Sequence, residues 1–190
     1  ETGGHNVYYG DYELAIEAYQ QALKINPRSA AAYEGWGVAL ESQGKFDAAQ
    51  DKLAKSLELD PNRKYAHFHL AKVQAKLGRT AEAIAHYRES LRIDPRDAQT
   101  HVSLGVLLEE TGDRQQAREH FEEAARIDPQ IPLPHVLLGI LLVRDGELER
   151  AEVCFRRALQ ANPDYVDALL QLAWIKTDSK QVELRDPQEA

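Results

Sequence analysis

The sequence contains few of the residue types that supply covalent cross-links, metal ligands or membrane anchors. Its 190 residues include one cysteine, Cys154, and no methionine. A single cysteine excludes an internal disulfide and any zinc site built from several cysteines. No apolar run approaches the roughly 20 residues that a membrane-spanning helix needs. The formal net charge of −8 has the wrong sign for neutralising phosphates, so nucleic-acid binding is not expected.

The spacing of the candidate catalytic and metal-binding residues also does not fit a catalytic or metal site. Three of the seven histidines, His67, His101 and His135, stand 34 residues apart at equivalent places in the pattern described below. Equivalent helices lie about 8–10 Å apart or more, whereas metal ligands must converge to about 2 Å from the ion. We interpret them as half-buried histidines between helices. Cys154 has no neighbouring histidine to activate it, so we expect an inert thiol. We therefore predict no catalytic residue, no metal site and no cofactor.

What the sequence does contain is a repeat of 34 residues. A helix-breaking proline returns at this interval at five positions: Pro27, Pro61, Pro95, Pro129 and Pro163. A glycine suited to a turn between helices returns in the same way: Gly10, Gly44, Gly78, Gly112 and Gly146. Each repeat thus reads as two helices joined by a short glycine turn, because the apolar residues on both sides of the glycine follow a helical period.

Each of the two helices carries its own signature. The first helix has a large residue followed by a small one: Trp36-Gly37, Leu70-Ala71, Leu104-Gly105, Leu138-Gly139 and Leu172-Ala173. The second helix has a small residue at Ala15, Ala49, Ala83, Ala117 and Ala151. One turn later it has a bulky one: Tyr19, Leu53, Tyr87, Phe121 and Phe155. Small residues at fixed spacing indicate close helix contacts, since a glycine inside a helix costs about 1 kcal/mol relative to alanine.

This pattern resembles the tetratricopeptide repeat (TPR), over about five repeats. The departures are Leu53 in place of an aromatic residue, Trp36 in place of leucine, and Ser56 and Ser90 in place of alanine. The resemblance implies an all-α fold, a right-handed superhelical solenoid of antiparallel helix pairs. The pattern predicts helices over residues 11–26, 30–42, 46–59, 64–76, 80–93, 98–110, 114–127, 133–144, 148–161 and 166–178.

The expected organisation is a repeat array over residues 10–179. Its repeats are about 1–29, 30–63, 64–97, 98–131 and 132–165, followed by a capping helix over 166–179. Residues 1–9 are expected to be a truncated first helix that includes an expression-tag remnant, or else a native terminus with a frayed helix. The first of these two interpretations implies that the chain is a fragment of a longer protein. The polar residues 180–190 are expected to form a flexible tail.

The candidate binding surface comes from the resemblance, which implies that the first helices line a concave groove where ligands lie. The groove positions predicted to contact a partner are Tyr65, Phe68, Lys72, Lys76, Val102, Val106, Leu133, Val136, Ile140, Val143, Arg144, Leu170 and Trp174. The helix over 133–144 is apolar on nearly all sides, which indicates that both its inner and its outer side are covered. A ligand, another subunit or the chain's own tail could cover the outer side, or the curvature of the superhelix could hide it.

We therefore predict a non-catalytic scaffold for protein–protein interaction, whose groove binds an apolar or amphipathic peptide or helix. Two alternatives stay open: a recognition or regulatory arm of a larger enzyme, such as a glycosyltransferase, and a self-association module. Some members of this family grip a carboxylate with paired Lys and Asn, but pairs such as Val102/Val106 lack both residues. The expected partner is another protein or peptide, with a homo-oligomer possible. The cytoplasm, the periplasm and a lumenal compartment all remain open.

Overall fold

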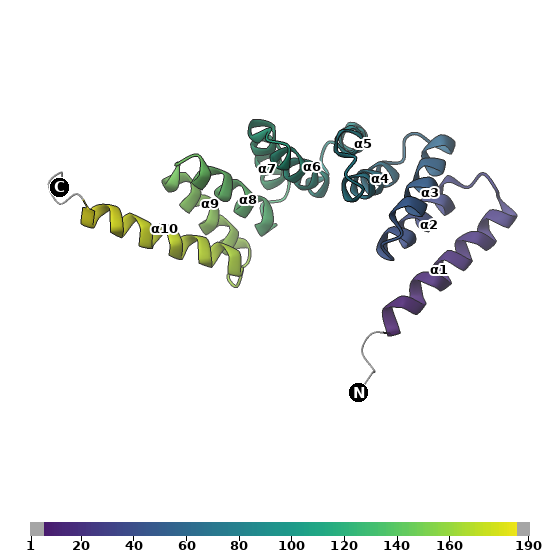
Figure 1. Ribbon diagram of the computed structural model, residues 1–190, viewed down its shortest axis with the longest axis horizontal. Coiled ribbons are helices and arrows are strands. Elements are labelled where there is room, and N and C mark those ends of the chain that lie inside the picture. The colour runs from purple at the N-terminus through teal and green to yellow at the C-terminus, as the bar shows by residue number, and fades with distance from the viewer. Residues whose placement is uncertain (1–5, 186–190) are drawn as a thin grey trace. The chain divides into compact units, whose positions relative to one another are not determined.

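The computed structural model describes the backbone of residues 6–185 and the side chains of residues 12–177. Within this range the chain forms ten α-helices and no strand (Figure 1). The helices are α1 (Asn6–Ile25), α2 (Ala30–Ser42), α3 (Phe46–Leu59), α4 (Lys64–Lys76), α5 (Thr80–Ile93), α6 (Ala98–Glu110), α7 (Arg114–Ile127), α8 (Pro132–Arg144), α9 (Leu148–Ala161) and α10 (Val166–Arg185). From α2 to α9 these bounds agree with the predicted ranges to within one residue.

The helix ends are set by local chemistry. Four turn glycines, Gly44, Gly78, Gly112 and Gly146, have positive φ values of 73° to 90°, a conformation that side chains disfavour. Three helices begin with a side-chain cap: Ser29 accepts from the Ala32 N–H, and two aspartates cap α6 and α7 in the same way. Short turns then reverse the chain, which makes neighbouring helices antiparallel.

Two expectations about the ends of the chain are wrong. Helix α1 continues through Gly10, where a turn was expected. Glycine is compatible with a helix, so Gly10 does not by itself impose a turn. Helix α10 continues to Arg185, so residues 180–185 of the expected flexible tail are helical. The expected tag remnant and residues 186–190 lie outside the described residues.

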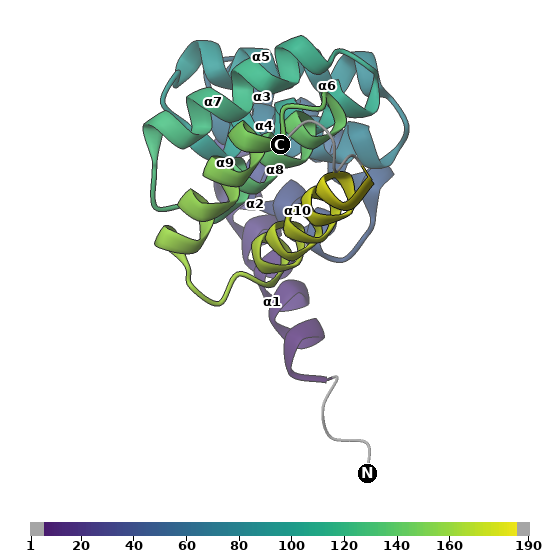
Figure 2. The ribbon, with the colours of Figure 1, turned by 90° about the vertical axis from the view of Figure 1, so that its left-hand side faces the viewer.

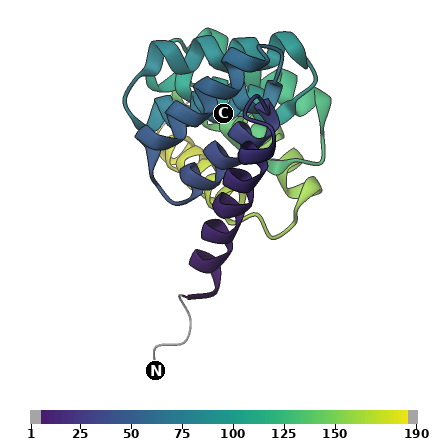
Figure 3. The same cartoon turned by 90° about the vertical axis from the view of Figure 1, so that its right-hand side faces the viewer.

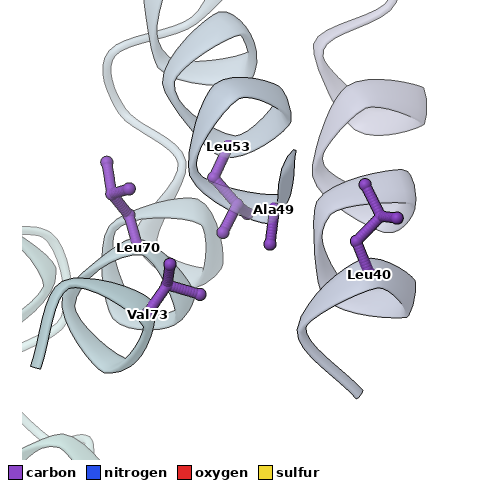
Figure 4. Packing of buried hydrophobic residues seen from close by; sticks show 5 residues of the cluster. All are labelled: Leu40, Ala49, Leu53, Leu70 and Val73. Carbon is purple, nitrogen blue, oxygen red and sulfur yellow. The ribbon is translucent and has the colours of Figure 1, made fainter. Parts of the chain in front are cut away.

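The chain divides into two compact units, Glu1–Arg96 and Asp97–Ala190. In unit 1, α2 pairs with α3 and α4 pairs with α5, while α1 packs on α2 and α3 on α4 (Figure 3). A core cluster of Leu40, Ala49, Leu53, Leu70 and Val73 joins α2, α3 and α4 (Figure 4). Leu53, which replaces the usual aromatic residue, is fully buried in this cluster.

The two serines that depart from the repeat pattern form hydrogen bonds to the paired helix. The Ser56 hydroxyl of α3 donates to the Ala30 carbonyl oxygen at 2.8 Å, and the Ser90 hydroxyl of α5 donates to the Lys64 carbonyl oxygen at 3.1 Å. Both serines are completely buried. Each buried hydroxyl therefore has a hydrogen-bond acceptor, and the bond links the second helix of a pair to the start of the first helix.

Unit 2 repeats the same construction with aromatic residues in the core. Helix α6 pairs with α7, α8 pairs with α9, and α10 lies beside α9 and α8 (Figure 2). Phe121 of α7 and Phe155 of α9 are fully buried. A Cβ atom at Gly105 would lie 2.6 Å from the Phe121 ring, and one at Gly139 would lie 2.6 Å from the Phe155 ring. The glycines in the first helices are thus required by close approach to these rings.

Candidate binding surface

In unit 1, the first helices are joined by ion pairs. Arg63 donates two hydrogen bonds to the Glu34 carboxylate, at 2.9 and 3.0 Å. Glu41 of α2 binds two partners on α4, the Lys72 ammonium and the His69 ring, each at 2.6 Å. Burial by itself would raise the pKa of Glu41, but the hydrogen bonds from His69 and Lys72 outweigh it and hold the pKa below its usual range. This face of unit 1 is therefore polar and internally paired.

The predicted groove residues of unit 1 differ in accessibility. Phe68 is only 7 % exposed and packs against Tyr87, with ring centroids 5.8 Å apart, so it belongs to the core. Lys72 is held by Glu41 and lies 5.7 Å from the Phe68 ring. Tyr65 is 57 % exposed, with the Lys64 ammonium 4.8 Å from its ring. Together with Lys76, which is exposed, Tyr65 is the accessible part of the prediction in this unit.

In unit 2, the predicted residues of α6 and α8 are mostly apolar and partly accessible. Leu133 is 40 % exposed. The half-buried members are Val102, Val106, Ile140 and Val143. Val136 is 2 % exposed and is therefore a core residue in this structure. The family resemblance placed Val136 on the groove side from its position within a single helix, whereas burial depends on the neighbouring helices as well.

Arg144, which was predicted to contact a partner, already forms an ion pair within unit 2. Its guanidinium donates to the Glu109 carboxylate and so links the last turn of α8 to α6. Half of the Arg144 side chain remains exposed, so the pair lies at the surface and contributes little to stability.

Within unit 2, helix α10 carries the most exposed apolar side chains of the predicted surface. Leu170 is 62 % exposed and Trp174 is 49 % exposed, one helical turn apart on the same face. Helix α8 contacts α10, and we expect these residues and the outer residues of α8 to lie on one side of unit 2. We call this set the unit 2 apolar face: Val102, Val106, Leu133, Ile140, Val143, Leu170 and Trp174.

Sequence reasoning missed a cavity of about 880 Å³ on α7, α8 and α9. Its lining includes His135, Leu138, Leu142, Val153, Cys154 and Arg157. Burial raises the pKa of the Cys154 thiol and lowers the pKa of His135, so both groups favour their neutral forms. The lining residues are spread over 40 positions of sequence, from Glu122 to Ala161, and no local motif marks them.

The histidines form pairs that the sequence analysis did not anticipate. His67, His101 and His135 are buried, more deeply than the half-buried state expected. The Nδ1 atoms of His67 and His86 lie 2.9 Å apart, and His101 and His120 repeat this geometry at 2.9 Å. The signal was present as a second histidine 19 residues after the first. Among the described residues, no group of three or more candidate ligands could hold a metal ion.

The tautomers of the first pair follow from its surroundings. The Nε2 atom of His67 lies 2.9 Å from the Pro61 carbonyl oxygen, which can only accept, so Nε2 carries a proton. In the neutral ring Nδ1 is then the acceptor, and His86 donates to it. The pKa of His86 is lowered by burial and then by the neighbouring His67. These histidines hold two helices together.

Paired antiparallel helices with this repeat define a class of protein, the helical-repeat interaction scaffolds. The family model described as the cilia and flagella-associated protein 70 C-terminal domain, a TPR domain, matches residues 3–168. The chain belongs to this TPR family. No helix in the described part of the chain has the length and apolar character needed to cross a membrane.

Curated relatives match over part of the chain. Superkiller complex protein 3 of Mus musculus is 34 % identical over 83 residues, which are 44 % of this chain and 5 % of the relative. A tetratricopeptide repeat and J domain-containing co-chaperone, DNJ1, of Cryptococcus neoformans is 35 % identical over 74 residues, 39 % of this chain and 14 % of the relative. The chain therefore spans a small fraction of the length of these relatives.

Solved structures share the fold. MamA superimposes with a TM-score of 0.76 at 22 % identity, over 87 % of this chain and 97 % of MamA. YrrB, whose structure is described as a TPR protein with an unusual peptide-binding site, superimposes with a TM-score of 0.71 at 22 % identity, over 85 % of this chain and 84 % of YrrB. At this identity the likeness establishes the fold alone.

Proposed function

We propose that the unit 2 apolar face binds an apolar or amphipathic segment of a partner protein, and that the chain acts as a non-catalytic scaffold. The observation that carries the proposal is the exposure of Leu133 on α8 and of Leu170 and Trp174 on α10, together with the partial exposure of Ile140 and Val143 on α8. Exposed apolar side chains gathered on one face of a protein mark an interaction site.

The chemistry of the face favours a helical or extended apolar ligand. A ligand helix offers apolar side chains at i, i+3, i+4 and i+7, which fit rows of apolar residues on neighbouring first helices. In unit 1 the first helices carry the ion pairs of Glu34 and Glu41, so we place the energetic centre of binding in unit 2. Lys76, exposed at the end of α4, is left to steer acidic partners.

The experiment uses Trp174 as its reporter. In a Trp36→Phe background, Trp174 is the only tryptophan, and a ligand that covers it should shift its emission to shorter wavelength. Peptides of about 18 residues, selected from a displayed amphipathic library, serve as probes. Removing one central apolar contact costs about 2 kcal/mol, so Ile140→Asp should weaken binding roughly 30-fold.

Two further variants make the outcome decisive. Leu170→Asp alters a residue too exposed to serve the core, so it tests the face even if Ile140→Asp unfolds the protein. Val153→Asp introduces the same charge at the cavity formed by α7, α8 and α9 and should leave binding unchanged. Selected peptides that lose affinity with Val153→Asp, but keep it with Ile140→Asp and Leu170→Asp, would refute the proposal. So would a library that yields no binding peptide.

A second candidate role is a recognition module within a longer protein, including a larger enzyme. It is favoured by the small share of the relatives that the chain matches, 14 % for the J domain-containing co-chaperone. Such a module would use the same apolar face, so the same variants apply to it.

A further inference from the structure

The cavity on α7, α8 and α9 lies where the histidine pairing of the repeat is broken. In two earlier repeats a histidine of the first helix meets a histidine of the second: His67 with His86, and His101 with His120. The residues in the same register on α8 and α9 are His135 and Cys154, and both line the cavity. A cysteine side chain is much smaller than an imidazole ring. The exchange therefore leaves room for a ring beside His135.

The buried ring of His135 has a hydrogen-bond acceptor without a partner. His135 is 5 % exposed, and its Nε2 atom lies 3.4 Å from the Pro129 carbonyl oxygen. A carbonyl oxygen can only accept, so Nε2 carries a proton. Burial lowers the pKa of His135, so the ring is neutral and Nδ1 is the acceptor. Within the described residues no group donates to this Nδ1 atom, and a buried acceptor is costly unless a donor reaches it.

The second group without a partner is Arg157, which also lines the cavity. It follows Cys154 by one helical turn, so the two residues are neighbours on the same face of α9. In three earlier second helices, the residue in register with Arg157 forms an ion pair with the residue three positions later: Lys55–Glu58, Glu89–Arg92 and Glu123–Arg126. In α9 that later residue is Gln160, which has no charge. Arg157 has no ion-pair partner in the part of the chain that the structure describes.

The rest of the lining combines an apolar floor with balanced charges. Leu138, Leu142 and Val153 supply apolar surface. The charged residues of the lining are three arginines and two glutamates, so the cavity has a net charge of +1 in a chain whose net charge is −8. A volume of about 880 Å³ with apolar walls and a few polar groups is typical of a small-molecule site.

We propose that this cavity binds a small aromatic acid, a molecule whose ring carries an O–H or N–H donor and whose short side chain ends in a carboxylate. The donor bonds His135 Nδ1, and the carboxylate pairs with the Arg157 guanidinium, whose planar geometry suits a carboxylate. The ring takes the place of the second imidazole, which in the two histidine pairs has its centroid 5.2 and 5.1 Å from the first. The cavity shares no lining residue with the unit 2 apolar face, so this inference does not rest on the proposed function.

A nuclear magnetic resonance titration of the whole chain with phloretate tests the ligand chemistry. Phloretate is a phenol with a propionate side chain, and a ligand of this size with typical efficiency binds with a Kd of about 1 mM or tighter. The amide signals of α7, α8 and α9 at the cavity should shift. Hydrocinnamate lacks the phenolic O–H, and tyramine has an ammonium group in place of the carboxylate. Each should bind at least about 5-fold more weakly than phloretate.

Three variants locate the site. Cys154→His restores the histidine pair and fills the place of the ring, so it should abolish phloretate binding while the helical content stays unchanged. Arg157→Gln removes the cation and should weaken binding at least about 5-fold. Because Arg157 is exposed, this variant tests the proposal even if Cys154→His does not fold. Arg156→Gln is the matched control, since Arg156 is paired with Glu152, does not line the cavity and should leave the affinity unchanged.

Four results would overturn the proposal. The first is a chain that does not bind phloretate at millimolar concentration. The second is a folded Cys154→His variant that binds it as tightly as the parent. The third is equal weakening by Arg156→Gln and Arg157→Gln, or equal affinity for hydrocinnamate, which would show that neither specific contact forms. The fourth is a set of shifted signals on α10 and around Ile140, which would place the ligand on the unit 2 apolar face instead.

Discussion

Replacing the Phe121 side chain tests whether its ring determines the identity of residue 105. The ring is completely buried, and truncating such a residue to alanine costs about 3–5 kcal/mol. A Cβ atom added at Gly105 would lie 2.6 Å from Phe121 Cε1 and 2.9 Å from Cδ1. Because Gly105 has no side chain that could move into the space, we expect the Phe121→Ala loss in the upper half of that range.

The same geometry predicts that Gly105→Ala changes sign with its background. In the unaltered protein the substitution gains about 1 kcal/mol of helix propensity but loses about 1–3 kcal/mol to overpacking. The net result is a loss of up to about 2 kcal/mol. In the Phe121→Ala background the ring is gone and the nearest remaining atom is the Ala117 carbonyl oxygen, 3.2 Å from the added Cβ, so a gain of up to about 1 kcal/mol remains. The two substitutions should therefore couple by about 1–3 kcal/mol.

Urea denaturation of the two single variants, the double variant and the parent measures this coupling. Repeat arrays can unfold in more than one step, so unit 2 should be followed by Trp174 fluorescence in the Trp36→Phe background, beside the helical circular dichroism signal. A Gly105→Ala substitution that stabilises both backgrounds equally would refute the reasoning. The ring of Phe121 would then not constrain residue 105.

Three further predictions concern stability. Ala117→Leu should lower the denaturation midpoint, with a loss of about 1–3 kcal/mol, because Ala117 is fully buried at the α6–α7 contact; an unchanged midpoint would contradict the close contact. Burial lowers the pKa of His86 and of His135, so the unfolded state binds more protons between its histidine pKa of about 6.5 and the lower folded-state pKa values. The free energy of unfolding should therefore fall as the pH drops from about 7.5 and should level off below the folded-state pKa values. A His86→Asn, His135→Asn double variant should show a shallower pH dependence in denaturation curves at several pH values, and an equally steep one would refute the assignment. Asp97→Ala should cost about 1 kcal/mol and speed amide exchange at Thr100, since the Asp97 carboxylate accepts from the Thr100 N–H at 3.2 Å.

The helix bounds could be predicted because their causes are local. A glycine with positive φ ends each first helix, and a proline soon after each second helix prevents its continuation, whatever the neighbouring helices do. Gly10 shows the limit of this reasoning. The same residue type at the same register lies inside α1, because glycine permits a turn but does not impose one.

The candidate site was harder to predict, because accessibility depends on neighbours distant in sequence. Val102 and Val136 are in register, yet one is half-buried and the other fully buried. Lys72 has the pattern of a free anchor, but Glu41, 31 residues earlier, holds its ammonium at 2.6 Å. Such contacts arise from side chains of adjacent first helices, whose positions a helical period does not specify.

The sequence by itself determined the repeat, the helices and the pairing of each large residue with a small one, because a 34-residue period records the same local contacts five times. Only the tertiary structure decided which of these surfaces remain open. Ala22 and Ala158 have the same identity and the same register, but Ala158 is fully buried where α9 packs against α8, whereas Ala22 is exposed on α1 in the described part of the chain. Exposure is set by whether a neighbouring helix is present, and residue identity alone does not contain that information.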